Sequence, residues 1–427
     1  KAGWAKLCFE VPAGVPLAGY GGEKPRLSTG IGDPLYIRAL VMEQGGRRFS
    51  LVSCDVLAVN NRLAEDLALK AGALGIPAGN FFIAATHTHS GPCGLSEGDE
   101  DPLSALIMGR PDPALIQTLK DRVVSALEKS VKNMKPCGLS SAAVKSPGIG
   151  SNRNDPAKPG DPCLSVLIVE TGDGERALVY SAACHPTVLN AKNLLVSADF
   201  PGETSRLLER GAVKIALFLN GSAGDISTRY TRRGGGFDEV RRLGSLLERQ
   251  VTEAAGKAEG HDDPVLKSGS ISVNLRIRRA PDPEESLETL KRLRAEFEAA
   301  KAEGRGDLRL LEARCEGAAL GLLYSRHHPP SKSRAVTVRF LQAGQLVFAF
   351  FPVELFSTLS NPLREQAPRF TPVSYAGGYL GYLPDGAIAD TDNYEKYTTI
   401  FAYGEGERLM AEVKRRLGEG LRPPAIP

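Results

Sequence analysis

The sequence predicts an α/β fold of layered, mixed β-sheets that are covered by helices. Short apolar runs rich in β-branched and aromatic residues alternate with segments in which apolar residues recur at helical spacing. No repeat, low-complexity stretch or linker divides the 427 residues. We therefore expect a single large domain that spans residues 1–427.

The first half of the chain alternates predicted strands and helices. Asp112 and Pro113 indicate the start of a helix, because Asp caps helices and Pro is tolerated in their first turn. The turn Thr171-Gly-Asp-Gly174 joins two strands into a hairpin. The expected strands cover residues 48–54, 81–85, 164–169, 177–183 and 213–219, and the expected helices cover 63–74, 113–131 and 240–251.

The second half begins with a highly charged stretch, residues 283–325, whose helical pattern is interrupted at 304–306. We interpret it as a solvated helical hairpin inserted into the domain, and a mobile cover over a site is the alternative. Strands return at 335–341 and 346–351, followed by a segment rich in glycine and tyrosine.

Composition excludes several classes of function. Lys and Arg number 53 and Asp and Glu number 50, so the net charge of +3 excludes a nucleic-acid binder driven by bulk charge. No apolar run approaches the roughly 20 residues that span a bilayer, so we expect no transmembrane helix. Seven cysteines without a C-x-x-C pair exclude a thiolate zinc site, while one disulfide stays open.

Two of the six histidines directly follow a predicted strand. His87 and His89 lie in the segment 86–92, at the end of strand 81–85. Strand side chains alternate with a period of two, so both rings can point to one side, at the edge where α/β folds bind ligands. An isolated H-x-H pair is a weak metal signal, and a ring that caps a loop is the alternative.

A third histidine repeats this arrangement. His185 follows strand 177–183, and Pro186 ends that strand. Asp199 comes shortly afterwards and could orient a ligating ring by accepting its second N–H. A histidine satisfied within the core is an equally good interpretation of His185 alone.

Two further strand ends carry polar side chains. Asp225 and Ser227 lie in a small-residue turn after strand 213–219, where the backbone can approach a ligand closely. Glu354 follows a very apolar strand, where a carboxylate is costly unless it is paired or binds a metal. A glutamate at a helix N-terminus is the alternative. Because three N or O ligands plus an open position characterise catalytic zinc sites, the combined pattern predicts a metal site.

These segments, in this order, resemble the N-terminal catalytic domain of the neutral, non-lysosomal ceramidase family. The most specific motif, Thr86-His-Thr-His-Ser-Gly-Pro92, is intact. The other matching segments are Val15–Gly21, Asn152-Arg153, His185-Pro186, Gly224–Ser227, Pro352–Glu354, Gly381-Tyr382 and Tyr394-Glu395.

The resemblance implies one zinc ion per chain, and it adds residues that spacing alone did not identify. The implied zinc ligands are His87, His185, Glu354 and Tyr382. The residues implied around the scissile bond are His89, Arg153, Ser227 and Tyr394, with Asp199 and Asp225 expected to support the site.

The implied activity is zinc-dependent hydrolysis of an amide in a ceramide-like or other N-acyl substrate, which places the chain in sphingolipid or related lipid metabolism. His89 would transfer protons, and Arg153 and Tyr394 would stabilise the oxyanion. Ser227 would orient the substrate, or act as nucleophile. Three alternatives stay open: a zinc esterase or lactonase on a small non-lipid substrate, an amidohydrolase-type TIM barrel, and a non-catalytic binding protein on the same scaffold.

The chain departs from the family pattern beside the substrate, while the implied ligands are kept. Thr228 stands where proline is usual, Asn154 where serine is usual, and Val353 where glycine is usual. The family's C-terminal immunoglobulin-like domain is expected to be absent. The resemblance also leads us to expect a secreted or periplasmic location, although the numbered chain begins at Lys1 without a leader.

Overall fold

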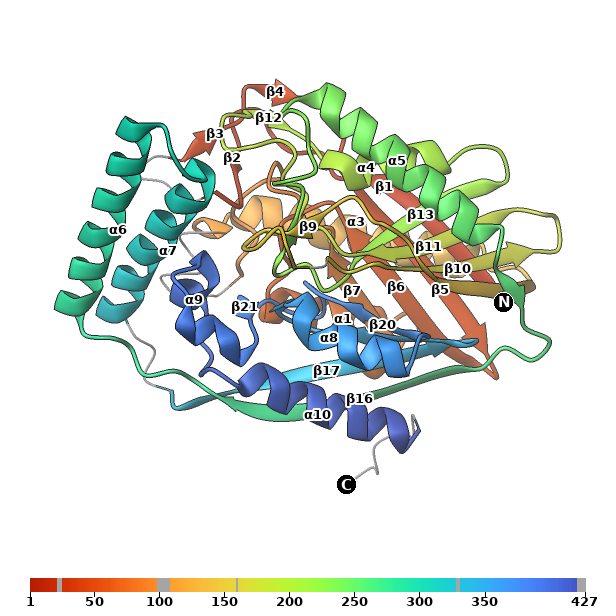
Figure 1. The fold of residues 1–427 in the computed structure, drawn as a ribbon. Helices are drawn as coiled ribbons and strands as arrows, with labels where there is room; N and C mark the ends of the chain where they lie inside the picture. Colours follow the sequence, from red (N-terminus) through yellow and green to blue (C-terminus); the bar gives the residue numbers. More distant parts are fainter. Residues whose placement is uncertain (21–24, 98–107, 159, 328–330, 421–427) are drawn as a thin grey trace.

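The computed structural model describes residues 1–20, 25–97, 108–158, 160–327 and 331–420. Three β-sheets meet in one apolar core, and helices cover the outer face of each sheet (Figure 1). Leu51, Leu217 and Phe348, one from each sheet, are fully or almost fully buried in this core. The prediction of mixed sheets covered by helices is therefore confirmed.

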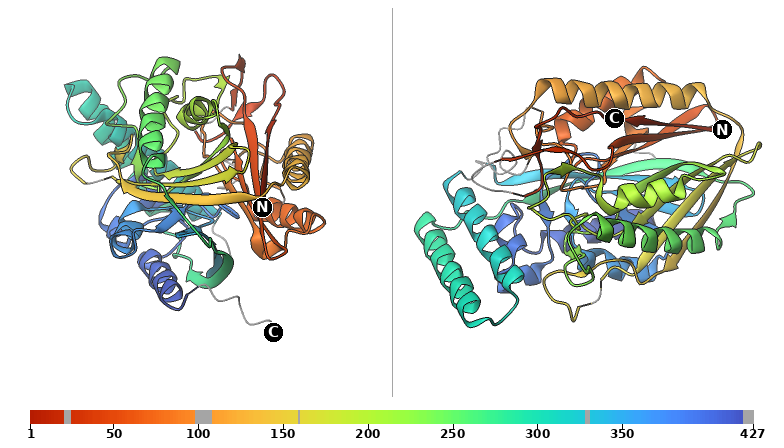
Figure 2. Two further views of the ribbon diagram at one scale, coloured as in Figure 1. Left: turned by 90° about the vertical axis from the view of Figure 1, so that its right-hand side faces the viewer. Right: turned by 90° about the horizontal axis from the view of Figure 1, so that it is seen from above.

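The first sheet has the order β1-β5-β6-β7 and contains one parallel pair, β6 with β7. Helices α1 and α3 pack on its outer face (Figure 2). Asp112 caps α3 by accepting hydrogen bonds from the amides of Ala114 and Leu115, as the sequence predicts. The elements are β1 (Ala2–Cys8), β5 (Tyr36–Gln44), β6 (Arg47–Cys54), β7 (Phe81–Ala85), α1 (Asn61–Gly72), α3 (Pro113–Lys132) and the 3₁₀ turn η1 (Ala78–Asn80).

The second sheet has the order β13-β11-β10-β8-β15. β10 and β11 form the predicted antiparallel hairpin, and β13 pairs with β11 in parallel. Helices α4 and α5 cover its outer face. The elements are β8 (Cys137–Lys145), β10 (Cys163–Thr171), β11 (Arg176–Ala182), β13 (Val213–Asn220), β15 (Glu259–Gly260), α4 (Asp199–Leu208) and α5 (Phe237–Ala255).

The third sheet has the order β16-β17-β18-β20, and β18 pairs with β20 in parallel. Helices α8 and α10 cover its outer face. The elements are β16 (Leu266–Arg276), β17 (Ser333–Ala343), β18 (Leu346–Phe350), β20 (Phe370–Val373), α8 (Ser357–Gln366), α10 (Glu405–Gly418) and the 3₁₀ helix η2 (Gly386–Asp390).

Short two-stranded pairings connect the loops beyond these strand ends. They are β2 (Pro16–Leu17) with β3 (Arg26–Leu27), β4 (Gly30–Ile31) with β12 (Leu195–Val196), β9 (Ser151–Asn152) with β14 (Ile226–Ser227), and β19 (Glu354–Leu355) with β21 (Tyr382–Leu383). Two of the pairs carry expected site residues, Ser227 in β14 and Glu354 beside Tyr382 in β19 and β21.

The charged stretch forms the predicted helical hairpin, α6 (Pro283–Glu303) and α7 (Leu308–Arg326), which projects from one side of the molecule (Figure 1). The αL residue Gly304 ends α6, as the glycine pattern predicts. α7 packs against α9 (Tyr394–Thr398), where a Cβ added to Gly317 would lie 2.7 Å from the Tyr394 Cα. The hairpin therefore contacts the segment that carries Tyr394.

Two open interpretations are settled by the fold. The TIM-barrel alternative is wrong, because the strands form separate open sheets with mixed pairing, and a TIM barrel needs one closed parallel sheet. All seven cysteines are free, so the single disulfide is not present. Within the described residues, no helix is both long and apolar enough to cross a membrane.

Candidate metal centre

Three imidazoles from two sheets meet in the buried interior. His87 and His89 follow β7, and His185 follows β11, as the strand-end pattern predicts. One ligand nitrogen from each ring lies within 4.8 Å of the other two. All three rings are buried, and His185 is completely excluded from solvent. The structure therefore brings together the three histidines that the sequence singled out.

Backbone carbonyls hold two of these rings in a fixed orientation. The Nδ1 of His87 lies 2.8 Å from the carbonyl oxygen of Leu57, and the Nδ1 of His185 lies 2.5 Å from that of Ala223. Each Nδ1 therefore carries the proton, which leaves each Nε2 as a free acceptor. His87 adopts a positive φ of 70°, a strained conformation that is concentrated at functional sites.

His89 differs from the other two histidines. Its Nε2 lies 3.3 Å from the Nε2 of His87, but its buried Nδ1 has no hydrogen-bond partner among the described residues. The backbone of Gly19 lies against the ring, since an added Cβ would be 2.4 Å from the His89 Nδ1. Tyr20 packs edge-on against the same ring. His89 is thus held by packing, without a tether at its second nitrogen.

Glu354, from the end of the third sheet, completes the cluster. Its Oε2 lies 3.0 Å from the Nε2 of His185 and 3.5 Å from that of His87. Tyr379 donates a hydrogen bond of 2.5 Å to Oε1, and Tyr375 donates one of 3.4 Å to Oε2. The carboxylate is therefore fixed from both sides. Glu354 lies in β19, before the N-cap residue Phe356 of α8, so the alternative of a glutamate at a helix N-terminus is wrong.

The protonation states suit a cation. Burial, and then the Arg153 charge, lowers the pKa of His185 to about 4. Burial acts to raise the pKa of Glu354, but the neighbouring His87 and His185 hold it well below its ordinary value. Burial also lowers the pKa of His89 well below 6.5. The cluster therefore presents the neutral imidazoles of His89 and His185 beside an ionised carboxylate.

Asn220, at the end of β13, connects the strand ends that carry these side chains. Its side-chain amide donates to the carbonyls of Thr86 and Cys184, one residue before His87 and His185 respectively. Its side-chain oxygen accepts from the Cys184 amide, and its own carbonyl accepts from Ser374. Sequence reasoning did not single out this residue, because a buried asparagine carries no motif of its own.

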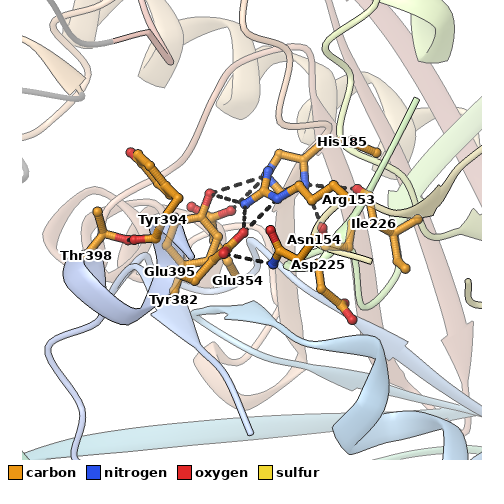
Figure 3. A network of polar contacts seen from close by, with 12 residues as sticks. Arg153, Asn154, His185, Asp225, Ile226, Glu354, Tyr382, Tyr394, Glu395 and Thr398 are labelled. Atoms are coloured by element: carbon orange, nitrogen blue, oxygen red, sulfur yellow. Dashed lines mark hydrogen bonds and ion pairs between the residues drawn. The ribbon is translucent and has the colours of Figure 1, made fainter. Parts of the chain in front are cut away.

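Arg153 links the cluster to a second group of polar residues (Figure 3). Its guanidinium donates to the Tyr382 hydroxyl at 2.9 Å and forms an ion pair with Glu395. The Tyr382 hydroxyl in turn lies 3.5 Å from the Nε2 of His185. The ring of Tyr394 packs edge-on against that of Tyr382. The structure therefore places Arg153, Tyr382 and Tyr394 at the site, together with Glu395, to which the sequence analysis gave no role.

Ser227 and Asp225 contact the segments next to His185 and Glu354. Ser227 is buried and forms a backbone bridge with His185, and its hydroxyl accepts a hydrogen bond from the Arg229 amide. Asp225 accepts hydrogen bonds from Asn152 and from the amide and hydroxyl of Ser357. It thereby ties the turn that holds His185 to the segment that follows Glu354.

The prediction that Asp199 orients a ligating ring is wrong. Both oxygens of Asp199 accept hydrogen bonds from backbone amides, those of Leu189 and Phe200. The Nδ1 of His185 faces the carbonyls of Ala223 and Ile226. Asp199 has a positive φ of 55° and begins α4, so its carboxyl organises the loop 189–200.

The residues present fit a bound divalent cation. The Nε2 atoms of His87 and His185 both lie within 3.5 Å of the ionised carboxylate of Glu354, which forms no ion pair with a Lys or Arg of the described residues. A cation would be shared by these lone pairs and would balance the buried charge. The donor set, imidazole nitrogens with carboxylate oxygen, is one that zinc and related transition metals accept.

The fold and the donor cluster define an α/β protein with a candidate metal centre where the ends of three sheets converge. The family model described as "Neutral/alkaline non-lysosomal ceramidase, N-terminal" matches residues 10–232, which is more than half of the chain. The chain therefore belongs to the neutral/alkaline non-lysosomal ceramidase family.

Individual relatives are similar over part of their length. A neutral ceramidase of Pseudomonas aeruginosa is 28% identical over 274 residues, which cover 58% of this chain and 40% of the relative. A neutral ceramidase of Mycobacterium tuberculosis is 27% identical over 217 residues, covering 45% of this chain and 33% of the relative. The chain thus spans well under two thirds of the curated relatives it matches.

Solved structures show the same fold over the whole chain. The crystal structure of the Pseudomonas aeruginosa neutral ceramidase matches with a TM-score of 0.75 and 22% identity, covering 100% of this chain and 76% of that one. A ceramidase complexed with C2 matches with a TM-score of 0.72 and 20% identity, with the same coverage.

Proposed function

We propose that this protein is a zinc-dependent hydrolase that cleaves the amide bond of a ceramide-like or other N-acyl compound. The observation that carries the proposal is the convergence of imidazoles and one carboxylate from three sheets on a single buried point. Membership of the ceramidase family supports an amide as the target.

In this proposal, zinc is held by His87, His185, Glu354 and Tyr382. When bound, zinc supplies a Lewis acid that activates water and polarises the carbonyl of the substrate. The two tethered rings support the assignment, because metal-bound histidines usually donate their second N–H to an oxygen.

His89 is proposed to move protons and not to bind the metal. Its Nδ1 lacks the oxygen partner that fixes the other two rings, so it is the least constrained imidazole in the cluster. From its place beside His87 it can accept a proton from water and deliver it to the leaving amine.

Arg153 and Tyr394 are proposed to stabilise the negative charge that develops on the carbonyl oxygen. Arg153 is positioned by Glu395, and its side chain already reaches the Tyr382 hydroxyl. Preorganised donors of this kind are typically worth a few kcal/mol in the transition state. Ser227 is proposed to orient the substrate, since the described structure places no histidine or carboxylate base at its hydroxyl.

Two alanine variants test the proposal. His185→Ala is expected to lose both stoichiometric zinc and amidase activity, whereas His89→Ala is expected to keep zinc and lose activity. Zinc is measured by elemental analysis after gentle purification, with activity on a fluorogenic N-acyl amide. Full zinc occupancy in His185→Ala contradicts the ligand assignment, and loss of zinc in His89→Ala makes His89 a ligand.

A matched ester and amide separate the leading proposal from an esterase. An amidase is expected to cleave both, because an ester is the easier target. Turnover of the ester alone, at full zinc loading, identifies an esterase. Absence of zinc and of both activities leaves a binding protein on the ceramidase scaffold.

A further inference from the structure

Asn220 joins the ends of strands that belong to different sheets. Its side-chain amide donates to the carbonyl of Thr86, which follows β7, at 3.2 Å and to that of Cys184, which follows β11, at 3.1 Å. Its main-chain carbonyl accepts from the amide of Ser374, which follows β20, at 2.9 Å. β7 and β11 lie in separate sheets and share no ladder, so the two side-chain bonds link segments that strand pairing leaves independent.

Each of the three tied positions directly precedes a residue of the cluster, namely His87, His185 and Tyr375. The rings of His87 and His185 meet edge to face with centroids 4.9 Å apart. The ring of Tyr375 stacks on His87, and its hydroxyl reaches Glu354. Because a side chain moves with the backbone beside it, the bonds of Asn220 restrain the distances between these rings.

The turn that follows this asparagine reaches the same cluster from a second direction. The carbonyl oxygen of Ala223 lies 2.5 Å from the Nδ1 of His185. The amide of Gly224 donates to the carbonyl of Leu355 at 2.9 Å, and a Cβ added to Gly224 would lie 2.6 Å from the carbonyl oxygen of Glu354. One buried turn therefore contacts the segments that carry His185 and Glu354, and Asn220 adds the segment that carries His87.

A direct backbone contact between the segments after β7 and β11 is weaker. The amide of His89 lies 3.4 Å from the carbonyl of Pro186. The buried hydroxyls of Thr86, Ser222 and Ser374, on the segments that meet at Asn220, have no hydrogen-bond partner among the described residues. These groups therefore give the two segments no second tie of comparable length.

The bonds of Asn220 use the donors and the acceptor of a carboxamide together. Besides donating twice, its side-chain oxygen accepts from the amide of Cys184 at 3.2 Å. Asn220 is completely excluded from solvent, so a replacement without these groups leaves two buried carbonyls unpaired, which is a costly state. An aspartate of the same shape has no N–H and would face both carbonyls with a carboxylate.

Resting on the proposed function, we propose that Asn220 is a positioning residue of the metal centre. By tying the ends of β7 and β11 together, it sets the distance between the Nε2 atoms of His87 and His185, and thereby the geometry in which the two rings hold an ion. It acts through the two rings, as partners of metal ligands commonly do.

Asn220→Ala tests this role, with Asn80→Ala as the matched control. Asn80 is also buried, and its amide donates to the carbonyl of Arg48 and accepts from the hydroxyl of Ser268, away from the cluster. Nitrogen-15 NMR of the histidine rings in the zinc-free proteins reports their orientation directly. Asn220→Ala is expected to shift or broaden the ring signals of both proposed histidine ligands, and Asn80→Ala is expected to leave them unchanged.

The affinity for zinc and the kinetics of the zinc-loaded proteins give two further readouts. Asn220→Ala is expected to bind zinc about tenfold to a hundredfold more weakly, the usual effect of losing a group that orients a metal ligand. At saturating zinc, kcat on an N-acyl amide is expected to fall while KM changes little, because the asparagine orients the ligands without contacting the substrate. A mere loss of stability, as in Asn80→Ala, changes neither value.

Unchanged ring signals in Asn220→Ala overturn the inference. The same changes in Asn80→Ala overturn it too, because the asparagine then contributes only to stability. If Asn220→Ala does not fold, Gly221→Ala replaces it: the added Cβ would lie 3.1 Å from that of Ala183 and press on the segment before His185. That variant is expected to shift the ring signal of His185, and an unchanged signal overturns the inference.

Failure of the proposed function gives a different result. A wild-type protein that holds no zinc and cleaves no amide contradicts the hydrolase, while the ring signals of the zinc-free proteins still decide the role of Asn220. Changed signals in Asn220→Ala alone support that role, and unchanged signals contradict it.

Discussion

At the scale of single residues, the candidate centre depends on side chains that fix other side chains. Tyr375 illustrates this: it has a positive φ of 57°, its ring stacks on His87 with centroids 3.8 Å apart, and its hydroxyl reaches Glu354. A strained tyrosine that contacts two of the proposed ligands restricts both. The metal affinity should therefore depend on residues that never touch the ion.

Tyr379→Phe tests this dependence. The change removes the 2.5 Å hydrogen bond to the Oε1 of Glu354 and leaves the ring in place. We expect the affinity for zinc to fall about tenfold to a hundredfold, the usual cost of losing a partner of a metal ligand. A competition titration against a chromophoric chelator measures it. Tyr375→Phe removes a longer bond and should cost less, and an unchanged affinity in both variants contradicts the idea.

Asp225→Asn should change how stability depends on pH. Burial raises the pKa of Asp225 to about 7, so between about pH 4 and 7 the folded protein binds a proton here that the unfolded chain has lost. The free energy of unfolding should then fall with rising pH by up to about 1.4 kcal/mol per unit at this group. Asparagine does not titrate, so the free energy of unfolding of the variant does not fall in this way. The stability of the variant should therefore rise relative to that of the wild type between pH 4 and pH 8.

Urea unfolding of the zinc-free proteins measures this difference across the pH range. Asp33 and Asp199 also have raised pKa values, but they are present in both proteins and cancel in the comparison. If the two curves stay parallel, the hydrogen bonds from Asn152 and Ser357 keep Asp225 ionised throughout.

The sequence predicted those site residues that lie directly after strongly apolar strands. His87, His185 and Glu354 follow β7, β11 and β18, where an apolar run makes a polar side chain conspicuous. Tyr382 and Arg153 came only from the family resemblance, because loop residues carry no periodic pattern. Asn220 and Tyr375 act through contacts with distant segments, and no local pattern encodes such contacts.

At the scale of elements, the hairpin of α6 and α7 contacts α9, the helix that carries Tyr394 and Glu395. The two helices share only a small apolar cluster with each other. Among the described residues, the surface of the hairpin that packs on the rest of the protein includes the face of α7 that contacts α9. The sequence predicted both helices correctly from their charge and glycine pattern. The sequence did not predict where the hairpin packs on the rest of the protein. That position depends on the face of α7 where Gly317 and Gly321, which lack side chains, allow α9 to approach closely.

Gly317→Ala should disturb this docking. The new Cβ would lie 2.7 Å from the Cα of Tyr394, so α9 must shift, at a cost of about 1–3 kcal/mol for overpacking. The shift moves Tyr394 and Glu395, the partner of Arg153, so kcat/KM should fall while zinc content stays unchanged. Gly321→Ala meets a side chain at 3.2 Å and should have a smaller effect. Full activity of the Gly317 variant would show that the hairpin does not position α9.

At the scale of the whole molecule, each sheet contributes one parallel pair of strands, and the ends of these pairs meet at the cluster. The pairs are β6 with β7, β11 with β13, and β18 with β20. A single ion would therefore link all three sheets through His87, His185 and Glu354. Any motion that separates two sheets must break a bond to the ion, so binding should stabilise the fold as a whole.

Removal and return of zinc test this coupling. At a free concentration one hundred times the dissociation constant, a ligand that binds only the folded state adds about 2.7 kcal/mol. For 427 residues this raises the midpoint of thermal unfolding by about 3 °C, from typical unfolding entropies per residue. We expect a chelator to lower the midpoint of the wild type and zinc to restore it. His185→Ala, which lacks one link between the sheets, should show no response to either, and a response of wild-type size there contradicts a site shared by three sheets.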